Sequence, residues 1–407
     1  MKSKANNTIK RAAPSIVGAA VLLGATSLVS RILGLIRDRL LAGTFGAGVE
    51  LDIYYASFRI PDLVFTFLVL GALSAGFIPF FTKRRAKKTR DGSAWTFTNN
   101  VLNFMGASLL VLSVVGIVFT PQILQIVAPG FGPEELAQAT HISRIMYLST
   151  ILLGLSSVFG GVLQGLKRFT LYALAPLFYN LGIILGALAA AETGGGIEIG
   201  RRAVLTRAFL HFFLQSLGAL LNGWRWQWTW NWKDKDVRKM LVLMGPRIIG
   251  LGLSQINLIV MTAIASLLAA GSITIFSFAN NIQYVPIGII GISFAIAAFP
   301  TMSEQANKGK RAALRKTVES TARNILFSIV PLSVVFLLLR AQIVRVVLGA
   351  GVFGWNETII TADVLAFFVL SMFAQALIPL LVRVYFAYKN TLTPAIVALV
   401  SASINIV

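Results

Sequence analysis

The chain has 407 residues, of which 56% are hydrophobic and only 13% are charged, and its mean hydropathy is +0.78. This composition lies outside the usual range of soluble globular proteins, so water is not the main solvent of this chain. The absence of cysteine excludes disulfides and thiolate metal sites. A net charge of +21 could suit nucleic acid, so the location of the charges has to decide between nucleic acid and membrane.

Long apolar windows recur along the whole chain. A hydrocarbon core of about 30 Å needs roughly 20 apolar residues per helix, because lipid cannot satisfy open backbone groups. The sequence therefore predicts an all-α polytopic membrane protein. The predicted spans lie near 15–43, 51–81, 97–120, 138–164, 171–191, 202–223, 238–269, 273–301, 317–347 and 359–387, with a last span that starts at 392 and is unfinished at Val407.

The basic residues are distributed unequally between the two sides of these spans. With the N-terminus inside, the cytoplasmic segments hold 23 of the 36 lysines and arginines, whereas the outer loops hold none. This asymmetry follows the positive-inside rule and predicts a multi-pass protein with a cytoplasmic N-terminus. The charge then indicates topology and attraction to anionic lipid of the inner leaflet, and we expect no nucleic-acid partner.

The first two predicted spans carry charges inside the membrane. Small and charged residues recur every three or four positions of the first span, which puts them on one helical face. They are Gly24, Ser27, Arg31, Gly34 and Asp38, with Arg37 beside them, and the second span adds Asp52, Arg59 and Asp62. A charge near the bilayer centre costs at least about 2.5 kcal/mol, so these residues should face a bundle interior or a wet cavity.

Two interpretations of these charges stay open. Because the first span runs outward and the second returns, we expect Arg37, Asp38, Asp52 and Arg59 to lie together in the outer half, with Arg31 nearer the middle. They could form ion pairs that hold two helices together. They could also form an anion site, because guanidinium groups suit phosphate oxygens and the cluster has one positive charge in excess.

A weak internal repeat indicates two lobes. Arg31–Gly34 in the first span matches Arg247–Gly250 in the seventh, and two further matches occur at nearly the same offset. Each copy holds six spans, an even number, which predicts parallel repeats related by an axis along the membrane normal. The predicted domains are a cytoplasmic N-terminus (1–14), an N-lobe (15–223), a Trp-rich cytoplasmic linker (224–237) and a C-lobe (238–407) that is cut short.

Several motifs carry a resemblance to a known family. Ser30–Asp38, Phe45–Gly48, Ala56–Pro61 and Gly71–Ser74 resemble the first helix pair of the MurJ (MviN) lipid II flippases, in the multidrug/oligosaccharidyl-lipid/polysaccharide exporter superfamily. The likeness continues as far as Pro394. It implies a V-shaped pair of six-helix lobes, usually followed by two more helices, in a protein of fourteen spans. This chain would lack about three of those spans.

The resemblance also implies a function. The family moves an undecaprenyl-diphosphate-linked peptidoglycan precursor from the inner to the outer leaflet of the bacterial plasma membrane by alternating access. Arg31 and Arg37 correspond to arginines of the family's cationic cavity, and Asp38, Asp52 and Arg59 occupy matching motif positions. We expect a monomeric transporter and no enzyme, without a cofactor or metal, and driven by a coupling ion or the membrane potential.

The sequence departs from the family pattern at two places. The stretch 63–70 has no charge, and Asn280 and Asn281 replace a charged pair in the eighth span. An amide pair can bind sugars or a phosphate oxygen but supplies no charge. We therefore include both in the predicted substrate site, with Arg247 and Arg383 as secondary candidates.

Two other transport functions stay open. One is a flippase for another lipid-linked oligosaccharide, which the missing family charges would allow. The other is a cation-coupled drug exporter of the same superfamily, which would need an unpaired acid such as Asp363.

The remaining motifs have plain explanations. Asp234-Lys235-Asp236 resembles a paired-carboxylate metal motif, but basic neighbours favour a solvated loop. Tryptophans alternate at 224, 226, 228, 230 and 232, which predicts an extended segment with its rings in the headgroup belt. The two histidines have no second ligand nearby, so we expect no metal site, and no phosphate-binding loop for ATP is present.

Overall fold

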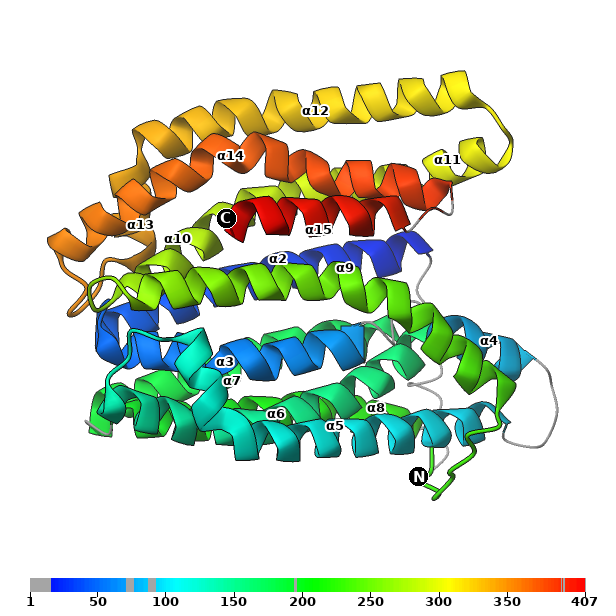
Figure 1. The fold of residues 1–407 in the computed structure, drawn as a ribbon. Helices are drawn as coiled ribbons and strands as arrows, with labels where there is room; N and C mark the ends of the chain where they lie inside the picture. Colours follow the sequence, from blue (N-terminus) through cyan, green and yellow to red (C-terminus); the bar gives the residue numbers. More distant parts are fainter. Residues whose placement is uncertain are drawn as a thin grey trace, which may run out of the picture.

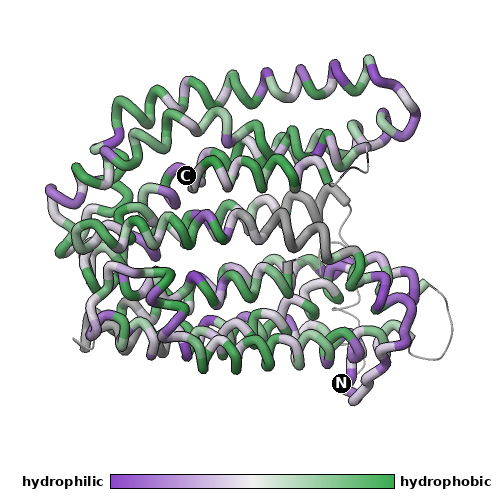
Figure 2. The backbone as a smooth tube through the Cα atoms, in the orientation of Figure 1, coloured by the Kyte–Doolittle hydropathy of each residue, from purple (hydrophilic) through white to green (hydrophobic). Residues whose placement is uncertain are grey.

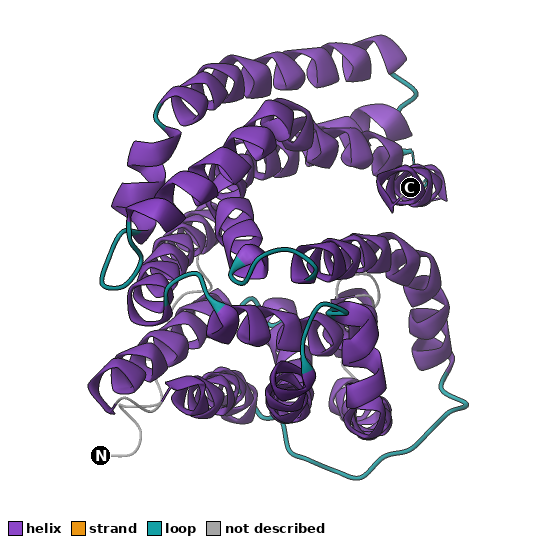
Figure 3. Cartoon of the chain, turned by 60° about the vertical axis from the view of Figure 1, so that its left-hand side comes forward, coloured by secondary structure: helices purple, strands orange, loops and turns teal. Residues whose placement is uncertain are grey.

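The structure is a computed structural model that describes residues 16–70, 77–86, 93–193, 196–388, 390 and 392–406. These residues form helices joined by turns and loops, with no strand among them (Figure 3). The prediction of an all-α fold is confirmed.

Fourteen α-helices and two π-helical segments are described. In the first half they are α2 (Ile16–Phe45), α3 (Val49–Phe65), η1 (Thr66–Leu70), α4 (Ile78–Ala86), α5 (Ser93–Val127), α6 (Pro133–Gly165), α7 (Phe169–Thr193) and α8 (Gly196–Leu221). In the second half they are α9 (Lys235–Ser266), α10 (Ser272–Pro286), η3 (Ile287–Ile292), α11 (Ser293–Asn307), α12 (Arg311–Leu338), α13 (Arg340–Leu348), α14 (Trp355–Ala387) and α15 (Leu392–Ile406).

Seven helical segments of the described chain are long and apolar enough to cross a membrane. Figure 2 shows hydrophobic residues along the middle of these helices. Large apolar side chains lie on the outside of the bundle, such as Phe327 (81% exposed) on α12 and Phe367 (77% exposed) on α14. Contiguous exposed apolar faces of this kind require an apolar surrounding, so the multi-pass membrane architecture is confirmed.

The helix geometry changes within three of the predicted spans, although the eighth remains a single membrane-crossing helix over Ser272–Asn307. The spans near 51–81 and 273–301 each contain a π-helical segment, and the span near 317–347 breaks at Leu339. In the eighth span the π-helical segment follows Pro286, whose nitrogen has no hydrogen to donate to the helix ladder. Gly291 of η3 packs directly on the backbone of Ala376, where a side chain would collide.

The helices pack in two sets. In the first set, α6 contacts α3, α5 and α8, and α7 contacts α2 and α8; in the second, α14 contacts α10, α11, α12 and α13, while α15 packs on α9. Figure 1 shows α12, α14 and α15 above, and α5, α6 and α8 below, with α2 and α9 between them. The predicted domain boundaries stay a prediction.

The bundle has two ends that differ in charge. At the end that we call the turn end, the loops 46–48, 128–132, 267–271 and 349–354 contain no basic residue. At the opposite end, which we call the linker end, lysines and arginines surround the segment 222–234 between α8 and α9.

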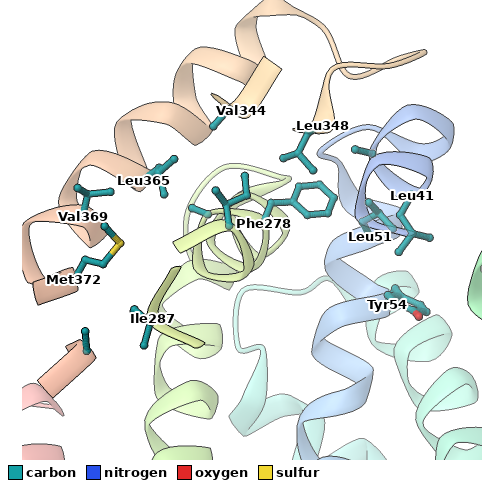
Figure 4. Packing of buried hydrophobic residues seen from close by; sticks show 14 of the residues in the cluster. Leu41, Leu51, Tyr54, Phe278, Ile287, Val344, Leu348, Leu365, Val369 and Met372 are labelled. Carbon is teal, nitrogen blue, oxygen red and sulfur yellow. The ribbon is translucent and has the colours of Figure 1, made fainter. Parts of the chain in front are cut away.

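The two sets of helices are joined at the turn end. Figure 4 shows Phe278 of α10 pointing toward Leu41 of α2 and Leu51 of α3, and all three are buried in one cluster. Backbone contacts add to this packing, since Val352 N donates to Gly43 O at 3.0 Å. The turn end is therefore a continuous apolar core that both sets share.

The Trp-rich linker is extended, as predicted, and lies along α5. Asn100 and Asn231 exchange two hydrogen bonds, in which Asn100 Nδ2 donates to Asn231 O (2.9 Å) and Asn231 N donates to Asn100 Oδ1 (2.8 Å). Asn103 Nδ2 donates to Thr229 O at 2.8 Å. Asparagine side chains thus replace the strand partner that an extended backbone would otherwise need.

We expect the Asn100→Ala substitution to lower the free energy of unfolding by about 2 kcal/mol, because it leaves two backbone groups of the linker without partners. Thermal unfolding in detergent, followed by tryptophan fluorescence, measures the effect. Asn307→Ala at the exposed end of α11 is the control and should change the melting temperature little. An equal shift for both variants would contradict the role of Asn100.

The two carboxylates of Asp234-Lys235-Asp236 are not in a solvated loop, and that prediction is wrong. Asp234 caps α9 and Asp236 lies in its first turn, and both accept hydrogen bonds from Arg84 of α4, at 2.6 and 2.8 Å. Partial burial lowers the pKa of Arg84, but the hydrogen bonds to Asp236 and Asp234 outweigh it, so its pKa lies above the usual value.

Candidate functional site

Asp38 joins the polar face of α2 to α10. Arg37 donates to Asp38 Oδ1 from Nε (2.9 Å) and Nη2 (2.7 Å), and Asn281 Nδ2 donates to Asp38 Oδ2 at 3.0 Å. The carboxylate is 2% exposed, so both of its oxygens need these donors. Arg37 and Asp38 thus form an ion pair, but it lies within α2 and does not hold two helices together as that interpretation required.

Asp52 has a different environment from the other predicted site residues. Its Oδ1 accepts hydrogen bonds from Thr274 N (2.7 Å) and Thr274 Oγ1 (2.6 Å), and its Oδ2 accepts one from Gly271 N (2.7 Å). A carboxylate at a helix N-terminus satisfies orphan N–H groups and interacts well with the helix dipole. Asp52 of α3 therefore caps α10 from across the interface between the two sets.

Arg59 bonds to hydroxyl groups of the second half. Its Nε donates to Thr262 Oγ1 of α9 at 2.7 Å, and its Nη2 donates to Ser277 Oγ of α10 at 3.3 Å. Neither partner carries a charge, so these bonds orient the guanidinium group without neutralising it.

A cavity of about 250 Å³ lies between the two sets of helices, and we call it the central cavity. Its charged and amide-bearing lining residues are Arg37, Arg59, Asp62, Arg207, Asn280 and Asn281. Tyrosine and phenylalanine rings complete the wall, and they are Tyr54, Tyr55, Phe58, Tyr179 and Phe276. Counting Asp38 beside Arg37, the three arginines exceed the two carboxylates by one positive charge.

Arg207 of α8 was not among the predicted site residues. Its guanidinium carbon lies 4.5 Å from the ring centre of Tyr179 and 4.8 Å from that of Phe58, and the residue is 3% exposed. A signal for it exists in the sequence, because Arg207, His211 and Gln215 recur every four residues within an apolar span. That spacing puts three polar side chains on one face of α8.

A second cavity, of about 810 Å³, lies within the first set of helices, and we call it the polar cavity. Its polar lining residues are Thr26, Ser27, Ser30, Arg31, Ser157, Gln164, Tyr172, His211 and Gln215. Arg31 also lies against η3, because a β-carbon at Gly288 would collide with its guanidinium group. Arg31 and Arg37 thus line two different cavities along the same helix.

Of the two secondary candidates, the structure describes only the side chain of Arg383, which lines neither cavity. Arg383 Nη1 donates to Pro379 O of its own helix at 3.0 Å. Arg247 lies in α9, and its side chain is outside the described part. The described residues contain no group of three His, Asp or Glu side chains that could hold a metal ion.

The arrangement of the central cavity can bind an anion. Three guanidinium groups from α2, α3 and α8 surround a small space, and each offers a planar fork of donors. Asn280 and Asn281 add neutral donors and acceptors on the side of α10.

Comparisons of sequence agree with one family. The model of the family described as "Lipid II flippase MurJ" matches residues 41–407. A "Probable lipid II flippase MurJ" of Rhizobium tropici is 28% identical over 399 residues, which cover 96% of this chain and 74% of the relative. A protein of the same name from Buchnera aphidicola subsp. Acyrthosiphon pisum (strain APS) is 28% identical over 382 residues, covering 93% and 75%.

Solved structures share the fold. A lipid II flippase MurJ in an inward closed conformation superimposes with a TM-score of 0.81 at 24% identity, covering 95% of this chain and 80% of that chain. An inward-facing multidrug resistance MATE family transporter of the MOP superfamily gives a TM-score of 0.69 at 13% identity, covering 95% and 98%. At these identities the likeness shows the architecture alone.

Proposed function

Because this chain belongs to the lipid II flippase MurJ family, we propose that it moves lipid II across the bacterial plasma membrane and binds the diphosphate in the central cavity. The observation that carries this proposal is the convergence of Arg37, Arg59 and Arg207 on one space. A diphosphate has several anionic oxygens, and guanidinium forks bind such oxygens in pairs.

The central cavity supports this assignment by its charge as well as its geometry. A buried charge without a counter-charge costs free energy. An anion bound beside the one positive charge in excess would offset this cost. In the described structure Arg59 bonds to hydroxyl groups and Arg207 lies against aromatic rings, and neither forms an ion pair, so their charges are available to a ligand. In this proposal, Arg207 supplies a positive charge in place of the charges that the family pattern has in the stretch 63–70.

We further propose that transport proceeds by alternating access. The linker end carries the basic residues and is the cytoplasmic end by the positive-inside rule. The turn end is then the outer side, and its shared core and the Asp52 contacts close the central cavity from outside. Opening outward requires that these contacts break while others form at the linker end.

One observation favours a related substrate as the second candidate. Asn280 and Asn281 supply amides where the family pattern has charges, and Asn281 bonds to Asp38. Amides suit neutral sugars, so another lipid-linked oligosaccharide is the alternative cargo. A cation-coupled drug exporter is less well supported, because it would need an unpaired acid. Asp363 is paired, since its Oδ1 lies 3.6 Å from Arg340 Nε.

Complementation of a strain depleted of its lipid II flippase tests the proposal. We expect the wild-type gene to restore growth and Arg37→Ala to fail, because it removes one charge from the central cavity and leaves Asp38 without its partner. A lost charge-assisted bond costs about 1.5–3 kcal/mol, or roughly a tenfold to hundredfold loss of binding. Membrane-inserted protein is quantified in parallel.

Arg144→Ala is the matched control. Arg144 lies in the apolar helix α6 with its side chain exposed, and its Nε donates to Ile117 O at 3.2 Å. This variant should rescue like the wild type. Rescue by Arg37→Ala would contradict the proposed anion site. Absence of rescue by inserted wild-type protein would favour the other lipid-linked oligosaccharide.

A further inference from the structure

The lining of the polar cavity differs in chemistry from that of the central cavity. Its hydrogen-bonding groups are hydroxyls, amides and a histidine, and Arg31 is the one charged residue among the described residues that line it. Small residues such as Gly161 and Ala173 lie between these groups. A concave site with apolar walls and a few placed polar groups suits a neutral ligand that has both hydroxyls and apolar faces.

Gln215 supplies a buried amide at the wall of this cavity. The residue is 2% exposed, and its Oε1 has no hydrogen-bond partner among the described residues. Gly160 makes room for the amide, because a β-carbon there would collide with it. The oxygen packs against Gly160 and is closed to the cavity, so the amide binds a ligand through its Nε2 donor.

His211 supplies an acceptor at the polar cavity. Ser156 Oγ lies 2.7 Å from His211 Nδ1 and also donates to His211 O at 3.1 Å. Because a hydroxyl has a single proton, both hydrogen bonds form together only if Nδ1 carries its own proton and donates it to Ser156. Nε2 is then the unprotonated nitrogen, which accepts hydrogen bonds.

The two cavities are close along α2. Arg37 lines the central cavity and Arg31 lines the polar cavity, and six residues of helix separate them, a rise of about 9 Å. In a lipid-linked glycan the saccharide is attached directly to the diphosphate. A diphosphate held near Arg37 would therefore bring its first sugars to the level of Arg31.

We propose that the polar cavity is the saccharide subsite of this transporter, where the Gln215 amide and His211 form hydrogen bonds with sugar hydroxyl or amide groups. This inference rests on the proposed function and adds the place and chemistry of glycan recognition. The lining of hydroxyl and amide groups beside a single arginine, next to the central cavity, carries it. Arg31 stands between the two subsites.

Binding of three synthetic lipids to the purified full chain tests the proposal. They are a polyprenyl diphosphate without sugar, the same lipid with a disaccharide, and the disaccharide lipid with its peptide. We expect the wild-type chain to bind the disaccharide lipid more tightly than the bare diphosphate. Gln215→Leu should weaken binding of both glycosylated lipids about three- to tenfold, the value of one hydrogen bond, and leave binding of the bare diphosphate unchanged.

Gln283→Leu is a matched control. Gln283 is 1% exposed and its Oε1 also has no partner among the described residues, but it lines neither cavity. Its substitution should leave all three affinities unchanged. His211→Phe keeps the ring volume and removes the acceptor, so it provides a second test if Gln215→Leu folds poorly, and it should weaken the same two lipids.

The outcomes separate this inference from the proposed function. Equal wild-type affinity for the bare and the disaccharide lipid would overturn the saccharide subsite while leaving the diphosphate site intact. Equal weakening of all three lipids by Gln215→Leu and His211→Phe would also overturn it. If the wild-type chain binds none of the three, the proposed function itself is wrong.

Discussion

Replacing Arg207 by alanine is expected to lower lipid II transport by about tenfold to a hundredfold. The substitution removes one of the three guanidinium groups of the central cavity, and a charge-assisted hydrogen bond to phosphate contributes about 1.5–3 kcal/mol. It also removes two cation–π contacts, with Phe58 and Tyr179. Flipping of fluorescent lipid II in reconstituted vesicles measures the rate, and binding of a bare polyprenyl diphosphate measures the affinity.

Two further variants separate charge from packing. Arg207→Lys keeps the charge but loses the planar fork, so we expect an intermediate transport rate. Arg323→Ala changes an exposed arginine on α12 and should have no effect. If Arg207→Ala lowers the melting temperature but leaves diphosphate affinity unchanged, Arg207 has a structural role and the anion site does not include it.

Replacing Asp52 by alanine is expected to shift the protein toward a state that is open at the turn end. The carboxylate is 4% exposed and accepts three hydrogen bonds from Gly271 and Thr274, which join α3 to α10. Loss of a helix cap costs about 0.5–2 kcal/mol, and the charged bonds add more, so we estimate roughly 3 kcal/mol. Such a change multiplies the population of the open state by about a hundredfold or more.

The absence of native cysteines makes this prediction directly measurable. Ala47→Cys places a single thiol beside Gly271, where the backbones are in close contact. A membrane-impermeant maleimide should label this thiol faster when Asp52 is alanine. Glu50→Ala, an exposed acid in the same first turn, is the control and should leave the rate unchanged. Unchanged labelling in the Asp52 variant would show that other contacts keep the turn end closed.

The predictions for the first helix pair succeeded to different degrees. An ion pair of Arg37 and Asp38 was among those anticipated, but it lies within α2, and the contact that joins Asp38 to a second helix is with Asn281. Arg59 and Asn280, more than 200 residues apart in sequence, were both expected in the site and both line the central cavity. That success depended on the family resemblance, because periodicity alone gives a face and does not identify the partner helix.

The same reasoning failed where the partner is distant. Asp52 lies seven residues from Arg59, two helical turns, and the expectation grouped it with the other charges. In the structure it reaches the amide groups of Gly271 and Thr274. Arg207 was overlooked because it is the single charged residue of the apolar stretch Val204–Leu221 in α8. By contrast, α2 and α3 each carry several charges, which drew the prediction to them.

The sequence by itself determined the membrane environment, the helical class and the presence of arginines that must be shielded from lipid. These properties depend on hydropathy and helical periodicity, which are local and can be read over about 20 residues. Only the tertiary structure decided that Arg31 and Arg37 line different cavities, that Asp52 caps α10, and that Arg207 lines the central cavity and Gln215 the polar cavity. Each of these depends on which helix packs against which face, and that choice is made by contacts between segments far apart in the chain.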